Sequence, residues 1–250
     1  MDLSVLASTD GGCADHAFRQ RFHPQLAGNG LGCAYALQDA YEASGFPKHL
    51  FANLHAGNET VANVIEDPRV APVTVTGSMR AGSAIAATAG KSMKTSLLEL
   101  GGADAFIVLA GANVDRAVEI VIGARFQNAG PVCLAAKRFI LDRPIAEGFT
   151  EKYVKAAARV KADDPLDKAT TIGPLARDDL RAGFHAQIER SIGSRAKLLL
   201  GGSKIDGPSF PYQPTVLGSG NPGMAAFDEE SFGPVAAITV ARDVEQAIKL

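Results

Sequence analysis

The sequence contains little cysteine, and the few thiols do not follow the spacing of a known structural site. Cys13, Cys33 and Cys133 are an odd number and lie far apart, without the Cys-x-x-Cys spacing of a zinc site. This pattern excludes a small secreted scaffold held by disulfides. We therefore predict reduced thiols, a reducing compartment and no metal site.

The sequence also lacks an excess of charge of one sign and lacks long apolar runs. Its 25 basic and 27 acidic residues give a net charge of only -2, too little to attract polyanions or lipid headgroups. No segment approaches the roughly 18 consecutive apolar residues of a membrane span, and residues 1–20 show no leader pattern. We expect a cytoplasmic protein with neither nucleic acid nor membrane as a partner.

The 250 residues, 46% of them hydrophobic, are enough to bury a sizeable core in one large or two small domains. Residues 1–30 show no clear period, and we assign them no firm structure from the sequence. Beyond them, helical and strand-like segments alternate, which favours an α/β fold with largely parallel strands. Predicted helices cover 33–43, 61–67, 78–91, 113–127, 146–161 and 177–193; predicted strands cover 50–54, 71–78, 105–110, 196–202, 212–218 and 233–240. The least arbitrary division separates residues 1–97 from 98–250.

The segment NAGPVCLAAKR, residues 128–138, raises the question of what Cys133 does. A lone cysteine in an α/β protein is often a small core residue. Here Gly130 and Pro131 end the preceding helix, which favours an exposed thiol. The following LAAKR is able to begin a helix whose dipole would stabilise a thiolate, and Lys137 and Arg138 add positive charge nearby in the sequence.

Three other segments allow both a structural and a chemical interpretation. Glu99 in SLLELGG is either an exposed residue at a strand edge or a base whose pKa desolvation raises. GSMRAG, beginning at Gly77, is either an ordinary glycine turn or a phosphate site at a helix N-terminus. EESFGPV, with Glu229 and Glu230, is by default a surface acidic pair that enters a strand.

Taken together, TGS, ELGG, NAGPVC and EESFGPV, in this order, resemble the signature segments of the aldehyde dehydrogenase superfamily. The resemblance covers about residues 30–250. The sequence is most similar to bacterial succinate-semialdehyde dehydrogenases over two segments, LLELGGADAFIVLAGANVDRAVE and ARFQNAGPVCLAAKRFIL. This resemblance implies a partial Rossmann-like cofactor domain in residues 1–97 and an α/β catalytic domain in residues 98–250.

The resemblance implies a role for each matching residue. Cys133 would attack the aldehyde and form a thiohemiacetal, then a thioester, with NAD or NADP as the cofactor. Glu99 would activate the water that hydrolyses the thioester. The implied cofactor contacts are Gly77 and Ser78 with the pyrophosphate, and Glu230 and Phe232 with the nicotinamide ribose and ring.

The chain departs from the family pattern at several positions. Pro131 replaces the glutamine of the family's GQxC, which removes one backbone N–H. Some semialdehyde enzymes carry an arginine where this chain has Gln127, so we predict Gln127 or Arg125 as the contact for a substrate carboxylate. The sequence also looks shortened relative to the family pattern. The asparagine of the oxyanion hole and the strand with the cofactor-binding lysine are not recognised in it, and the family's final segments would follow Leu250.

Three functions remain open from the sequence. The first is NAD(P)-dependent oxidation of a small-molecule aldehyde, with succinate semialdehyde implied by the resemblance. The second is an inactive shortened relative that acts as a binding or oligomer partner, either with itself or with a full-length relative. The third is a cysteine hydrolase or acyltransferase that needs no cofactor.

Overall fold

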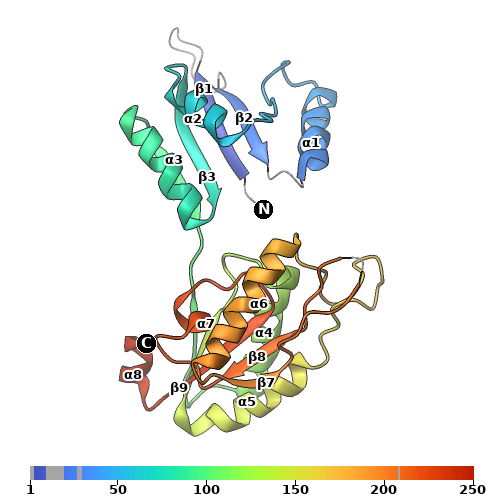
Figure 1. Cartoon of the computed structure of the whole chain (residues 1–250), viewed down its shortest axis with the longest axis vertical. Coiled ribbons are helices and arrows are strands. Elements are labelled where there is room, and N and C mark those ends of the chain that lie inside the picture. The colour runs from blue at the N-terminus through green and yellow to red at the C-terminus, as the bar shows by residue number, and fades with distance from the viewer. Residues whose placement is uncertain (1–2, 10–19, 27–29, 208) are drawn as a thin grey trace. The chain divides into compact units, whose positions relative to one another are not determined.

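The computed structural model describes residues 3–9, 20–26, 30–207 and 209–250, in two compact units, Met1–Gly101 and Gly102–Leu250 (Figure 1). The boundary lies after Gly101 rather than after residue 97. Strand β4 (Ser96–Leu100) pairs with β3 (Val70–Gly77) along its whole length, and this pairing keeps β4 in the first unit. The roles that the sequence predicts for the two parts remain predictions.

The first unit contains a four-stranded sheet in the order β2-β1-β3-β4. Strands β1 (Leu3–Thr9) and β2 (Gln20–Leu26) form an antiparallel pair, in the region before residue 30 to which the sequence pattern allowed no firm assignment. Pro24 interrupts the sequence pattern of β2. It is tolerated because β2 is an edge strand, where a missing N–H breaks no essential pairing. The expectation for Cys13 lies outside the described residues.

Three helices accompany this sheet: α1 (Leu31–Ala43), α2 (Asn58–Glu66) and α3 (Met79–Lys91). They confirm the predicted helices, but the strand predicted at 50–54 is wrong, because only Phe51 makes an isolated bridge there. Its ring instead stacks on Tyr41, with ring centroids 4.8 Å apart. The buried core joins α2 and α3 to β3: Val61, Ile65, Val70, Val73, Val75 and Ala89.

The second unit is built on a five-stranded sheet in the order β5-β6-β9-β8-β7. Three of its pairings are parallel and only β7 with β8 is antiparallel, which confirms the predicted α/β architecture. The strands are β5 (Ala105–Val108), β6 (Arg138–Asp142), β7 (Lys197–Leu200), β8 (Thr215–Gly218) and β9 (Val235–Ala241).

Helices cover both faces of this second sheet. On one face, α4 (Val114–Phe126) and α5 (Arg143–Ala157) pack around Phe139 and Ile238. On the other face, α6 (Asp178–Gly193) packs on Leu217 and Val235. Successive side chains of a strand point to opposite faces, so the nearly continuous apolar sequence of β9 serves both cores. Two short helices, α7 (Ala225–Asp228) and α8 (Val244–Lys249), flank β9 in sequence.

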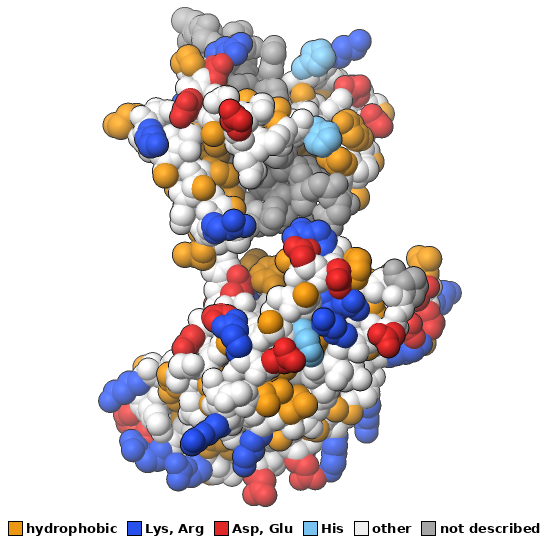
Figure 2. Space-filling model, in the orientation of Figure 1, with side chains coloured by type: hydrophobic (Ala, Val, Ile, Leu, Met, Phe, Trp, Pro, Cys, Tyr) orange, Lys and Arg blue, Asp and Glu red, His pale blue; other side chains and the backbone are white. Residues whose placement is uncertain are grey.

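The surface carries charges of both signs. Figure 2 shows acidic and basic side chains intermixed on the visible face.

Among the residues that the structure describes, no helix is both long and apolar enough to cross a membrane.

Candidate active site

Cys133 lies on an exposed turn between α4 and β6. After α4, Asn128, Ala129 and Gly130 have positive φ angles of 52°, 60° and 90°, so three consecutive residues adopt the left-handed region. A left-handed non-glycine residue costs about 1–2 kcal/mol, which the surrounding contacts must offset. The helix predicted at LAAKR does not form, because β6 begins at Arg138, so the expected helix N-terminus is not present beside the thiol.

Gly130 brings this turn into backbone contact with the segment before β9. A Cβ atom added at Gly130 would lie 2.5 Å from the carbonyl oxygen of Gly233, closer than real Cβ atoms approach. The positive φ independently favours glycine. The Cys133 turn and the EESFGPV segment are therefore packed together in this unit.

Arg125 joins the same two segments from below the surface. Its guanidinium is fully buried and donates to the carbonyl oxygens of Val235, Gly233 and Gly130, the last at 3.1 Å. It also donates to Ser231 Oγ at 3.3 Å. Burial lowers the pKa of Arg125 to about 10, so the side chain is still charged at neutral pH. The predicted contact of Arg125 with a substrate carboxylate is wrong, because its donors are used inside the protein.

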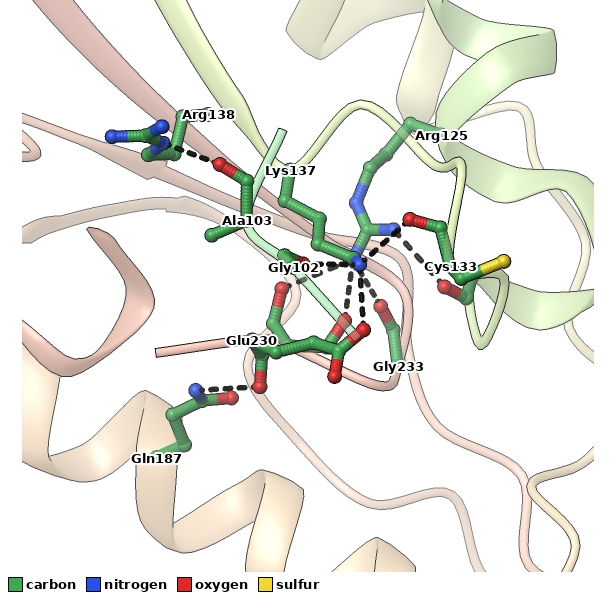
Figure 3. Close-up of polar contacts among 11 residues, drawn as sticks. Gly102, Ala103, Arg125, Cys133, Lys137, Arg138, Gln187, Glu230 and Gly233 are labelled. Atoms are coloured by element: carbon green, nitrogen blue, oxygen red, sulfur yellow. Dashed lines mark hydrogen bonds and ion pairs between the residues drawn. The ribbon is translucent and has the colours of Figure 1, made fainter. Parts of the chain in front are cut away.

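Lys137 forms a second buried junction, shown in Figure 3. Its ammonium, in a side chain only 1% exposed, donates to Glu230 Oε1 at 2.8 Å, to the Cys133 carbonyl oxygen at 3.1 Å and to that of Gly102 at 2.5 Å. The Cys133 sulfur points away from this ammonium. The sequence indicated a cation near Cys133, but it gave no sign that the cation binds the backbone and a distant carboxylate.

The two adjacent glutamates of EESFGPV have different surroundings. Glu229 makes an exposed ion pair with Arg190 at 2.7 Å, and this hydrogen bond lowers the pKa of Glu229. Glu230 is partly buried on Lys137, and its backbone carbonyl oxygen accepts from Gln187 at 3.3 Å. Phe232 keeps 39% of its surface exposed. Only Glu229 therefore matches the default interpretation of a surface acid.

Gln127 is exposed directly after α4, and within the described part of the chain its side chain makes no hydrogen bond. It therefore presents an uncharged amide to solvent. Its contact with a substrate remains a prediction.

The remaining predicted site residues belong to the first unit. Ser78 is the N-cap of α3 and its hydroxyl accepts from the Ala81 N–H at 3.3 Å, while Gly77 ends β3. The first turn of α3 contains no acidic residue, so its N-terminus is compatible with an anion.

Glu99 is exposed on β4, an edge strand, so the predicted desolvation of its carboxylate is wrong and the exposed-edge interpretation holds.

No metal ligand set supplements these groups in the described ranges. Nowhere in them do three His, Cys, Asp or Glu side chains gather as they would around a metal ion. The reactive and binding groups of the second unit are the exposed thiol of Cys133, the carboxylate of Glu230 that is paired with Lys137, and the partly exposed ring of Phe232.

Comparisons with known proteins identify the family of the chain. A family model described as "Aldehyde dehydrogenase family" matches residues 27–250. The succinate semialdehyde dehydrogenase Sad of Escherichia coli, named with NAD(P)+, is 48% identical over 90% of this chain and 51% of its own length. A succinate-semialdehyde dehydrogenase of Mycolicibacterium paratuberculosis, named with NADP+, is 42% identical over 87% of this chain and 46% of its own length.

A solved structure shares the fold as well. The succinic semialdehyde dehydrogenase of Streptococcus pyogenes, in complex with NADP+, matches with a TM-score of 0.87 and 34% identity, over 90% of this chain and 50% of that chain. The chain thus spans about half the length of the curated relatives it matches.

Proposed function

Because this chain belongs to the aldehyde dehydrogenase family, we propose that it oxidises an aldehyde to the carboxylic acid with NAD or NADP, using Cys133 as the nucleophile. The observation that carries the proposal is the placement of the exposed Cys133 turn against the segment of Glu230 and Phe232, held by two buried cations. A filler cysteine would be buried and would need no such support.

In the proposed reaction, the Cys133 thiolate adds to the aldehyde carbonyl carbon and forms a thiohemiacetal. The Cys133 N–H, which has no acceptor among the described residues, is available to stabilise the oxyanion. A nicotinamide held beside Glu230 and Phe232 would supply the acceptor for the hydride on this carbon. Glu99 takes a proton from the water that attacks the thioester, the acid is released as Cys133 leaves as the thiolate, and Glu99 returns its proton to solvent.

Each unit, taken by itself, contains residues whose chemistry suits part of a nicotinamide dinucleotide. In the second unit, Glu230 Oε2 has no partner among the described residues and can accept from a ribose hydroxyl, while the exposed face of Phe232 offers a surface for the ring. In the first unit, Gly77 and Ser78 precede a helix N-terminus suited to a phosphate. Relatives named with NAD(P)+ and with NADP+ support either cofactor.

Succinate semialdehyde is the proposed substrate, because it appears in the names of the relatives. Of the two residues predicted to contact its carboxylate, the exposed Gln127 is available and the buried Arg125 is not. An amide binds a carboxylate more weakly than a guanidinium does. We therefore expect Gln127→Arg to lower KM for succinate semialdehyde by about tenfold and to leave KM for uncharged butanal unchanged.

The test follows the ultraviolet absorbance of NADH or NADPH while the purified protein is mixed with succinate semialdehyde and each cofactor in turn. Cys133→Ala should abolish the signal, and Cys33→Ala, which removes the other exposed thiol of the described chain, should retain it. Oxidation that persists in Cys133→Ala would refute the nucleophile. Folded wild-type protein that binds cofactor without turnover would instead support the non-catalytic alternative.

A further inference from the structure

The buried ammonium of Lys137 has all three of its protons directed to acceptors from distant parts of the second unit. Gly102 precedes β5, Cys133 lies on the turn before β6, and Glu230 precedes β9. A lysine ammonium has three donors and no acceptor, so these contacts use its full hydrogen-bonding capacity. Lys137 therefore has no free donor with which to bind a substrate or to act as an acid.

The contact with Glu230 leaves this carboxylate with one occupied and one open oxygen. Oε1 accepts from Lys137 at 2.8 Å, and no described residue donates to Oε2. Without the ammonium, the carboxylate would lie near the carbonyl oxygens of Gly102 and Cys133, whose dipoles repel it. Lys137 thus selects the carboxylate position that leaves Oε2 free.

The same ammonium lies 5.7 Å from the centre of the Phe232 ring. This distance is within the range of a cation–π attraction. One buried cation therefore touches the proposed ribose contact, the proposed ring contact and the backbone of the proposed nucleophile.

We propose that Lys137 is a positioning residue that holds Glu230 in the conformation that binds the nicotinamide nucleoside, and fixes it relative to the Cys133 backbone. This role rests on the proposed function. It differs from a purely structural role because the effect of Lys137 on cofactor affinity passes through the Glu230 carboxylate.

A double-mutant cycle separates these two roles. The dissociation constants of NAD and NADP are measured by calorimetry for the wild type, Lys137→Met, Glu230→Gln and the double variant. We expect Lys137→Met to weaken binding about tenfold when Glu230 is present, and less than about twofold when Glu230→Gln is already in place. If the variant turns over, KM for the cofactor should rise while kcat changes little.

Lys137→Arg provides the second variant if Lys137→Met does not fold. The arginine keeps the charge but not the single-centre geometry, so it should give a smaller loss that again disappears in the Glu230→Gln background. Arg190→Met, which removes the exposed partner of the neighbouring Glu229, is the matched control and should not alter cofactor affinity.

The outcomes distinguish the positioning role from the proposed function. Equal losses in both backgrounds, for either lysine variant, would show that Lys137 acts only on the fold and would overturn the positioning role. Wild-type protein that binds neither NAD nor NADP would overturn the proposed function, and the role of Lys137 with it.

Discussion

Replacing Arg125 by methionine should destabilise the second unit and loosen the turn that carries Cys133. Methionine approximately retains the volume and apolar stem of the side chain but removes every donor. The carbonyl oxygens of Val235, Gly233 and Gly130 then lose a charged partner inside the protein. Because these oxygens belong to the two segments that meet at the site, the loss of stability and the change at Cys133 should appear together.

The magnitude follows from two opposing terms. The three hydrogen bonds from the charged guanidinium to carbonyl oxygens contribute roughly 2 kcal/mol each, about 6 kcal/mol together. Burial lowers the Arg125 pKa from 12.5 to about 10, and a difference of that size corresponds to roughly 3 kcal/mol spent on desolvating the charge. Methionine removes both the hydrogen bonds and the desolvation cost, so the free energy of unfolding should fall by about 3 kcal/mol. For a unit of this size, the melting temperature should fall by roughly 6–12 °C.

The assay is calorimetric unfolding, with hydrogen exchange on α4 and β9 to assign the transition to the second unit. The rate of Cys133 alkylation by iodoacetamide, read from its peptide, reports the turn. Arg116→Met on the same helix is the control, because Arg116 only makes an exposed ion pair with Glu119 and its loss should cost under about 1 kcal/mol. If Arg125→Met lowers the free energy of unfolding no more than this control does, the hydrogen bonds of Arg125 do not stabilise the second unit.

Three further predictions concern glycine, capping and pH. Gly130→Ala should cost about 2–3 kcal/mol, because its φ is 90° and its Cβ would overlap the carbonyl oxygen of Gly233. Gly123→Ala, inside α4 with open space around it, should instead stabilise by about 0.5–1 kcal/mol, and equal thermal shifts would contradict this reasoning. Ser78→Ala should cost about 1 kcal/mol by removing the cap of α3, seen as faster hydrogen exchange in its first turn; unchanged exchange would refute the cap. Because Arg190 lowers the folded-state pKa of Glu229, their pair should contribute under about 1 kcal/mol above the unfolded pKa of Glu229 and lose this as pH falls through the folded pKa. Unfolding of Arg190→Met and wild type across this range tests the sign, and a difference that grows toward acid pH would contradict it.

The local sequence was sufficient to predict most helices and the parallel sheet of the second unit. Alternation of β-branched residues predicted β3, and the spacing of apolar residues predicted α4, because each pattern reports one buried face of a regular element. The strands before residue 30 received no assignment from the sequence, because β2 is held by pairing with β1 and β1 by pairing with β3, and neither strand has a clear period of its own. The segment predicted as a strand at 50–54 makes only isolated contacts of this kind, a bridge at Phe51 and a hydrogen bond from the Leu54 N–H to the Pro24 carbonyl oxygen, so no continuous ladder forms.

The sequence by itself determined that Cys133 follows a helix end, because Gly130 and Pro131 are adjacent there and a proline has no N–H with which to continue a helix. Only the tertiary structure decided which charged groups support it. Arg125 and Val235 are 110 positions apart, and Lys137 and Glu230 are 93 apart, so no local pattern connects them. The same holds for Glu99, whose leucine neighbours suggested burial while the position of β4 at the sheet edge leaves it exposed. Burial of a charge depends on what the whole fold places around it, and this is the property that sequence spacing does not encode.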